Sequence, residues 1–132
     1  MHYVALVIGD DIDAIMDPYN EGKHTIEHTD EYGDTYPHNP VGFWDWFEVG
    51  GRWTNELILK DGTRTNSARR RDIETYAIDT GPFRVVTPEG TFARWERISG
   101  KYGEHPGHTE RFWKVWNNLP PNVLVTIVDY HS

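Results

Sequence analysis

The sequence of 132 residues has no cysteine and only two methionines. The absence of cysteine excludes disulfides, thiolate metal sites and cysteine nucleophiles. Long hydrophobic runs are also missing. The apolar stretch near the start, Val4 to Ile8, is far too short to cross a membrane, and it lacks the basic flank of a signal peptide. We therefore expect a cytoplasmic protein with no membrane partner.

Basic residues are scarce compared with acidic ones. The chain has 13 lysines and arginines against 21 aspartates and glutamates, so its formal net charge is −8. This charge disfavours direct contact with nucleic-acid backbones and with anionic membrane surfaces. A basic or cationic partner fits the charge better.

Aliphatic residues are few, and aromatic residues compensate for them. The hydrophobic fraction is 37%, whereas aromatic residues make up 14% of the chain. Each aromatic ring buries on the order of 150–250 Å². A chain of this length forms one domain, so we expect residues 1–132 to be a single domain with an aromatic-rich core.

The stretch Phe43 to Leu59 holds three of the six tryptophans and a pair of glycines, Gly50 and Gly51. Glycine adopts the positive φ that tight turns need. The pattern therefore predicts a β-hairpin that turns at these two glycines. The long segment 20–42 before it has no sustained period and is rich in Gly, Pro, Asp and His, which indicates a loop.

Two apolar strands are predicted at the ends of the chain, Tyr3 to Ile8 and Val123 to Val128. Apolar residues recur at helical spacing from Ile12 to Tyr19 and from Phe112 to Leu119, which predicts one helix after the first strand and one before the last. A further hairpin is predicted between residues 83 and 98. This order predicts an α+β fold, a ferredoxin-like sandwich in which both end strands lie in one mostly antiparallel sheet, with two helices on one face and an inserted β-hairpin.

Two pairs of polar residues are candidates for chemistry. Asp129 and His131 alternate on one face of the last strand, where they could bind a metal ion, hold a substrate or form an acid/base pair. The alternative is that a chain terminus is simply solvated. Asp45 and Arg52 would lie across the predicted hairpin, either as a structural ion pair or as the floor of a ligand pocket.

Histidines His24 and His28 are four residues apart, the spacing of an HxxxH metal site on a helix. The pattern of their segment is not helical, and no third ligand follows at the sequence spacing of a known metal site. They are therefore only weak candidates, and solvated loop histidines are the alternative. The chain has no phosphate-binding loop or dinucleotide fingerprint, and we predict no cofactor and no metal.

Several short motifs together resemble a family of small proteins encoded by actinobacterial phages and related mobile elements. They are Val4 to Asp11, Asp17 to Glu21, Trp44-Asp45-Trp46 with Gly50-Gly51-Arg52-Trp53, Asp72-Ile73-Glu74, and Val128-Asp129-Tyr130-His131. The match covers most of the chain. The family has a WDW box followed by a GGRW box and ends in VDxH.

The resemblance implies an origin more than a mechanism, since the family has no assigned activity. Its polar positions correspond here to Glu21, Asp45, Arg52, Asp72, Asp129 and His131. Arg71 and Glu74 depart from the family's GDID-like box, which weakens the case for a site at that turn. Family members often carry a long insert before the WDW box, sometimes with paired cysteines like a zinc knuckle, and this chain has only its histidine-rich loop.

Two functions follow as hypotheses. The first is a non-catalytic phage accessory protein, active in host takeover or anti-defence, that binds a host or defence protein in the infected bacterium. Its expected binding residues are Trp44, Trp46, Trp53, Glu21 and Asp72, since exposed tryptophans are common interface anchors. The alternative is a small hydrolase or nucleotide-binding enzyme whose site joins Asp129, His131, Asp45 and Arg52.

Overall fold

The computed structural model of the protein describes residues 1–98 and 101–132. A six-stranded sheet forms its centre, in the order β10-β9-β1-β13-β4, and β7 also pairs with β13, ahead of β4 along the same edge. The strands are β1 (His2–Ile8), β4 (Trp46–Val49), β7 (Ser67–Arg69), β9 (Arg84–Thr87), β10 (Gly90–Ala93) and β13 (Leu124–His131). The fold is mixed α+β and mostly sheet.

The two end strands lie side by side at the centre of this sheet. β1 pairs antiparallel with β13 along its whole length and parallel with β9 on its other edge. Residues Val4 to Ile8 are all buried, as are Val125 to Tyr130. Strands that are apolar at nearly every position need cover on both faces. The prediction that they share one sheet is confirmed.

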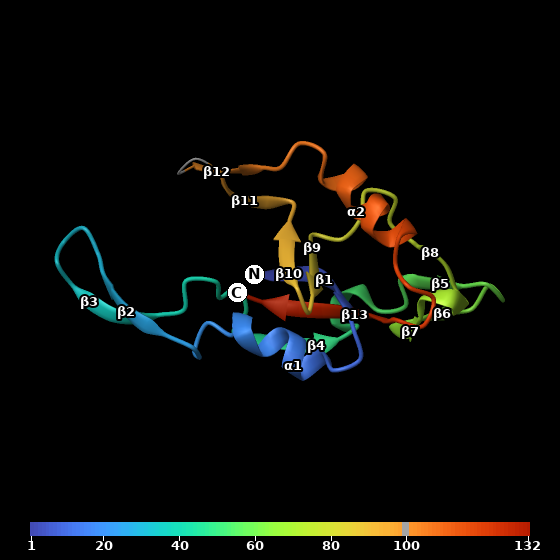
Figure 1. The fold of residues 1–132 in the computed structure, drawn as a ribbon, viewed down its shortest axis with the longest axis horizontal. Coiled ribbons are helices and arrows are strands. Elements are labelled where there is room, and N and C mark those ends of the chain that lie inside the picture. Colours follow the sequence, from blue (N-terminus) through green and yellow to red (C-terminus); the bar gives the residue numbers. More distant parts are fainter. Residues whose placement is uncertain (99–100) are drawn as a thin grey trace.

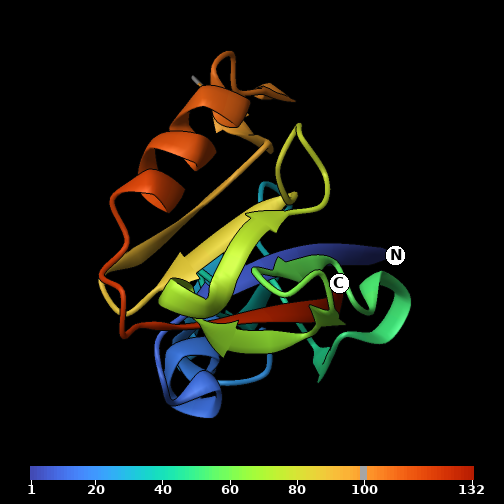
Figure 2. The same ribbon diagram turned by 90° about the vertical axis from the view of Figure 1, so that its right-hand side faces the viewer.

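The two helices lie on opposite faces of the sheet (Figures 1 and 2), so the prediction that they share one face is wrong. α1 (Ile12–Met16), extended by the turn η1 (Asp17–Tyr19), covers one face, and α2 (His108–Asn117) covers the other. Side chains alternate along β1. Leu6 therefore belongs to the α2 cluster and Val7 to the α1 cluster. The ferredoxin-like arrangement is not confirmed.

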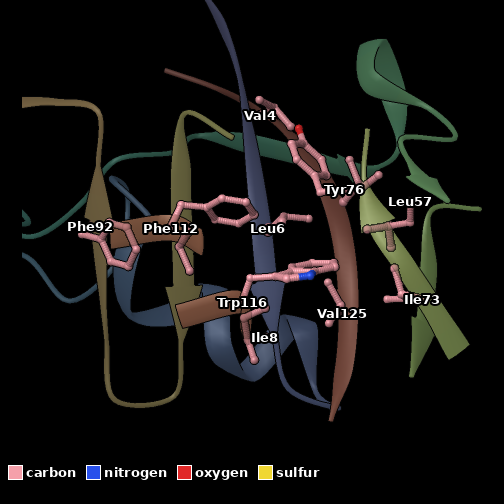
Figure 3. Packing of buried hydrophobic residues seen from close by; sticks show 12 residues of the cluster. Val4, Leu6, Ile8, Leu57, Ile73, Tyr76, Phe92, Phe112, Trp116 and Val125 are labelled. Carbon is pink, nitrogen blue, oxygen red and sulfur yellow. The ribbon is translucent and has the colours of Figure 1, made fainter. Parts of the chain in front are cut away.

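The core on the α2 face is rich in rings. Phe112 and Trp116 point from α2 toward Leu6 and Val125 of the central strands (Figure 3). A three-stranded sheet in the order β6-β5-β8 covers the rest of this face. Its strands are β5 (Leu57–Leu59), β6 (Arg64–Thr65) and β8 (Ile73–Tyr76), and the turn η3 (Arg70–Asp72) precedes β8.

The stretch Phe43 to Leu59 turns at its glycines without forming the predicted hairpin. Gly50 and Gly51 have φ values of 75° and 54°, so the chain does reverse there. β4 pairs with β13, however, whereas β5 pairs with β6 and β8 in the other sheet, and the turn η2 (Gly51–Trp53) separates them. Both faces of the stretch carry rings, so periodicity alone did not indicate which strand it would pair with.

The segment predicted as a long loop contains a β-hairpin instead. β2 (Ile26–Thr29) and β3 (Thr35–His38) form a two-stranded ribbon that projects from the body of the molecule, at the left of Figure 1. We call residues 26–38 the β2–β3 arm. Every residue in its two strands is exposed.

Residues 83–98 form the predicted hairpin only in part. β9 and β10 pair as expected, whereas β11 (Trp95–Ile98) leaves the sheet and pairs with β12 (Lys101–Glu104). Among the described residues, no helix has the length and apolar character needed to cross a membrane.

Candidate functional site

Asp129 is a fully buried carboxylate at the end of the central strand β13, with only 1% of its side chain exposed. Its Oδ2 accepts a hydrogen bond from the backbone N–H of Arg52 at 3.0 Å. Its Oδ1 lies 2.8 Å from Nδ1 of His2. Buried carboxylates need such partners, and here both oxygens have one.

His131 forms a second pair of the same kind. Its Nδ1 lies 2.8 Å from Oδ1 of Asp45. The antiparallel register of β1 and β13 places His2 directly opposite His131, and the two rings meet edge to face with their centroids 5.3 Å apart. Two Asp–His pairs therefore lie next to each other on the α2 face of the sheet, with Trp46 against His2 at 5.9 Å.

The four residues predicted to form a site are only partly brought together. Within the described residues, Asp45 and Arg52 do not form the expected ion pair, because β4 and β5 do not pair with each other. Arg52 contributes its backbone N–H, and its side chain is exposed. Asp129 and His131 share a face of the sheet, and His2 contacts both of them, Asp129 through a hydrogen bond and His131 through its ring.

His2 was missed by the sequence analysis. The signal that could have found it is the strand register, since two antiparallel end strands of nearly equal length bring His2 close to His131. The apolar pattern of these strands predicts that they lie in one sheet, but it does not predict that they are neighbours or what their register is.

The His131–Asp45 pair is the part of this cluster that a substrate could reach. Their side chains are 41% and 48% exposed, whereas Asp129 is enclosed. A carboxylate at Nδ1 leaves Nε2 of the histidine free to exchange a proton, which is the arrangement used in general acid–base catalysis.

The three tryptophans expected to bind a partner do not form one surface. Trp44 donates its Nε1–H to the carbonyl of Met16 at 2.7 Å and packs on the α1 side. Trp53 packs against the core on the α2 side. Trp46, with 45% of its surface exposed, is the only one of the three that is freely accessible.

Glu21 and Asp72 belong to different parts of the fold. The backbone N–H of Glu21 donates to the carbonyl of Trp44 at 2.8 Å, and its side chain lies in the wall of a cleft that also contains Arg84. Asp72 belongs to η3, beside the three-stranded sheet, and its carbonyl accepts the N–H of Lys60 at 3.0 Å.

The two histidines considered as weak metal ligands have separate partners. Nε2 of His24 lies 2.7 Å from Oδ2 of Asp17, and this hydrogen bond, with one from Lys23, lowers the pKa of Asp17. His28 lies on the arm, where its ring meets that of Tyr36 at 5.2 Å. Within residues 1–98 and 101–132, no three His, Asp or Glu side chains are placed to hold a metal ion.

One face of the β2–β3 arm carries a cluster of rings. Alternation places Ile26, His28, Tyr36 and His38 on this face, and the rings of His28 and His38 lie 5.4 Å apart. The arm forms a sheet of its own with two strands, so the outer edges of both β2 and β3 leave backbone groups without a strand partner.

Comparisons of the chain with models of protein families, with curated proteins and with solved structures found no match.

Proposed function

We propose that the protein is a non-catalytic binding protein that contacts its partner through the β2–β3 arm. The observation that supports this proposal is the exposure of every residue in both strands of the arm. An isolated two-stranded hairpin is at best marginally stable in water. A partner that pairs with an open edge of the arm, or covers its rings, would stabilise it.

The chemistry of the arm favours a basic partner protein. Residues 26–38 contain four acidic residues and neither lysine nor arginine; the acids are Glu27, Asp30, Glu31 and Asp34. The exposed side chains of Ile26 and Tyr36 supply apolar anchors beside these charges. Aromatic anchors inside a charged rim are typical of protein interfaces.

The resemblance noted in the sequence suggests where the partner belongs. A phage accessory protein would act in the cytoplasm of the infected bacterium, on a host or defence protein, in host takeover or anti-defence. The acidic arm and the overall charge of −8 are compatible with such a role.

The test is to shorten the arm without disturbing its base. Residues 26–38 are replaced by a short Gly–Ser linker, and Asn39 is kept, because its side-chain amide donates to the carbonyls of Pro18 at 3.0 Å and Asn20 at 2.8 Å. Trp46→Ala removes an exposed ring outside the arm and is the matched control. Thermal unfolding verifies that both variants fold.

Tagged wild type and both variants are used to capture proteins from lysate of a candidate host, and any captured protein is then purified and titrated. We expect one protein that binds wild type and Trp46→Ala with equal affinity and the shortened variant at least about tenfold more weakly. Equal binding to the shortened variant, or no captured protein, would refute the proposal.

The His131–Asp45 pair favours a second candidate function, a small hydrolase or nucleotide-binding enzyme. The observation is the 2.8 Å contact between two half-exposed side chains, which suits a general base. Hydrolysis of activated esters and phosphoesters would be measured for wild type, His131→Gln and Asp45→Asn, with Trp46→Phe as the control. Loss of a general base costs about 10²- to 10⁴-fold in rate, so unchanged rates in the first two variants exclude this function.

A further inference from the structure

A cleft of about 540 Å³ opens on the α1 face of the sheet, on the opposite side from the Asp–His pairs. Six of its fourteen lining residues are aromatic, and the walls come from the central strands, from the segment before β4 and from the β11–β12 hairpin. The rings that line it are Tyr3, Phe43, Phe83, Trp95, Tyr102 and Tyr130. Pockets that bind small molecules have this size and combine apolar walls with a few fixed polar groups.

Arg84 is the fixed polar group of this cleft. Its Nε donates to the hydroxyl of Tyr130 at 3.1 Å, and its Nη1 donates to Oγ1 of Thr91 at 3.1 Å. Its guanidinium carbon lies 4.0 Å from the centre of the Phe43 ring. The guanidinium is therefore held in one position before any ligand arrives, which lowers the entropic cost of binding.

No carboxylate in the described chain lies within ion-pair distance of Arg84. Both acidic side chains that line the cleft have other partners. Glu96 contacts His105 at 2.8 Å and accepts the N–H of Ala93 at 3.1 Å. Glu21 accepts the hydroxyl of Ser132 at 2.8 Å.

The tyrosine beside Arg84 does not neutralise it either. Burial raises the pKa of Tyr130 to about 12, so its hydroxyl stays protonated at neutral pH. In a protein with 21 acidic and 13 basic residues, a positioned arginine without an anionic partner is unexpected unless a ligand supplies the anion.

We propose that this cleft binds a small anion that carries a planar aromatic ring and a single negative charge. Arg84 would hold the anionic group through its Nη2 amino group, which donates no hydrogen bond within the part of the chain that the structure describes, and the ring would stack on Trp95 and Tyr102. These two side chains already lie nearly parallel, at 23°, with their centroids 5.9 Å apart, and both are exposed.

A single charge follows from the electrostatics of the cleft. Among the described residues that line it, Arg84 is the only basic one, and Glu21 and Glu96 are the acidic ones. A group with several negative charges would be repelled by these acids and by the overall charge of −8. Carboxylates and cyclic phosphodiesters both carry one charge, and both match the hydrogen-bonding geometry of a guanidinium.

The test titrates two anions and their neutral counterparts into the full chain by calorimetry. The probes are 2-naphthoate with 2-naphthamide, and 3′,5′-cyclic AMP with adenosine. We expect one anion to bind at least about tenfold more tightly than its neutral counterpart, because a charge-assisted hydrogen bond would be lost. The anion that binds identifies the source, a carboxylate or a phosphodiester.

The variant Arg84→Met keeps an apolar stem over Phe43 and removes the charge. Arg111→Met is the matched control, because Arg111 also lies 4.0 Å above a phenylalanine ring, that of Phe92, outside this cleft. We expect Arg84→Met to weaken binding at least about tenfold and Arg111→Met to leave it unchanged. The proposal is overturned if neither anion binds better than its neutral counterpart. It is also overturned if Arg84→Met and Arg111→Met bind the anion with equal affinity.

Should Arg84→Met fail to fold, Trp95→Ala provides a second test at an exposed side chain. Stacking of a ring on an aromatic side chain supports a loss of about tenfold in affinity for this variant. An affinity identical to that of wild type would contradict the stacking part of the proposal.

Discussion

The close approach of Gly51 to Asp129 leads to a quantitative prediction for Gly51→Ala. Gly51 has a φ of 54°, in the left-handed region, and a Cβ at this position would overlap the side chain of Asp129. That carboxylate is buried, and it accepts a hydrogen bond from the N–H of Arg52, the next residue along the turn. It cannot move aside without losing its partners.

Two costs add in this variant. The left-handed conformation costs an alanine about 1–2 kcal/mol. Displacement of the carboxylate sacrifices charge-assisted hydrogen bonds worth about 1.5–3 kcal/mol. We therefore expect Gly51→Ala to lower the free energy of unfolding by roughly 3–5 kcal/mol, a large fraction of the stability of a small domain.

Gly62→Ala is the matched control. Gly62 also has a positive φ, 87°, but a Cβ added there would have no atom within 4 Å. The control therefore carries the conformational cost of about 1–2 kcal/mol without the overlap. The difference between the two variants isolates the contact with Asp129.

Urea unfolding measures both variants, with the midpoints compared at a common m-value. At this chain length we expect the melting temperature of Gly51→Ala to fall on the order of 10–15 °C, and that of Gly62→Ala to fall by about a third as much. Equal losses in the two variants would show that the turn relaxes freely around Asp129, which would refute the reasoning.

Three further predictions concern the core and buried polar groups. Phe112→Ala removes a buried ring and should lower the free energy of unfolding by about 3–5 kcal/mol in urea. The ring of His108 contacts the carbonyl of Pro82, and burial lowers the pKa of this histidine below its usual 6.5. The free energy of unfolding should therefore fall as the pH drops below about 6.5, by at most about 1.4 kcal/mol per pH unit. The variant His108→Gln should flatten this decline. Burial raises the pKa of Glu56, so the stability that its protonated form contributes is lost as the pH rises. Glu56→Gln should therefore stabilise the protein more at pH 7 than at pH 4, which unfolding in urea at the two pH values would measure.

The sequence predicted the centre of the fold because the end strands carry a strong signal. Tyr3 to Ile8 and Val123 to Val128 are apolar at nearly every position, which requires cover on both faces, and most of their residues are buried in the structure. The same observation already argued against two helices on one face. A helix on a single side would leave alternate residues such as Ala5 and Val7 exposed, and α1 covers them.

The central stretch was mispredicted because tight turns do not determine strand partners. Gly50 and Gly51 reverse the chain as predicted, but β4 pairs with β13, and β5 pairs with β6 and β8. The arm was missed for a different reason. Its strands contain Pro37, charges and histidines, and they bury nothing, so they lack the alternation that indicates a strand.

The candidate sites depended on register, which composition does not contain. The pairing of His2 with Asp129 follows from a seven-residue ladder between β1 and β13. Arg84 is the one charged residue of the short strand β9. A charged residue in an otherwise apolar strand is the signal in the sequence that its side chain has a polar environment. Its lack of an anionic partner is visible only in three dimensions.

One strand supplies both candidate sites. Along β13, Asp129 and His131 face the α2 side with the Asp–His pairs, whereas Tyr130 faces the α1 side and binds Arg84. A one-residue shift in the pairing of β13 would move every one of these groups to the wrong face. Substitutions that change only side chains on one face should therefore leave the other site intact, whereas substitutions that alter the register of β13 should disable both. A variant such as His131→Gln that also abolished anion binding in the Arg84 cleft would indicate a shifted strand, not a shared site.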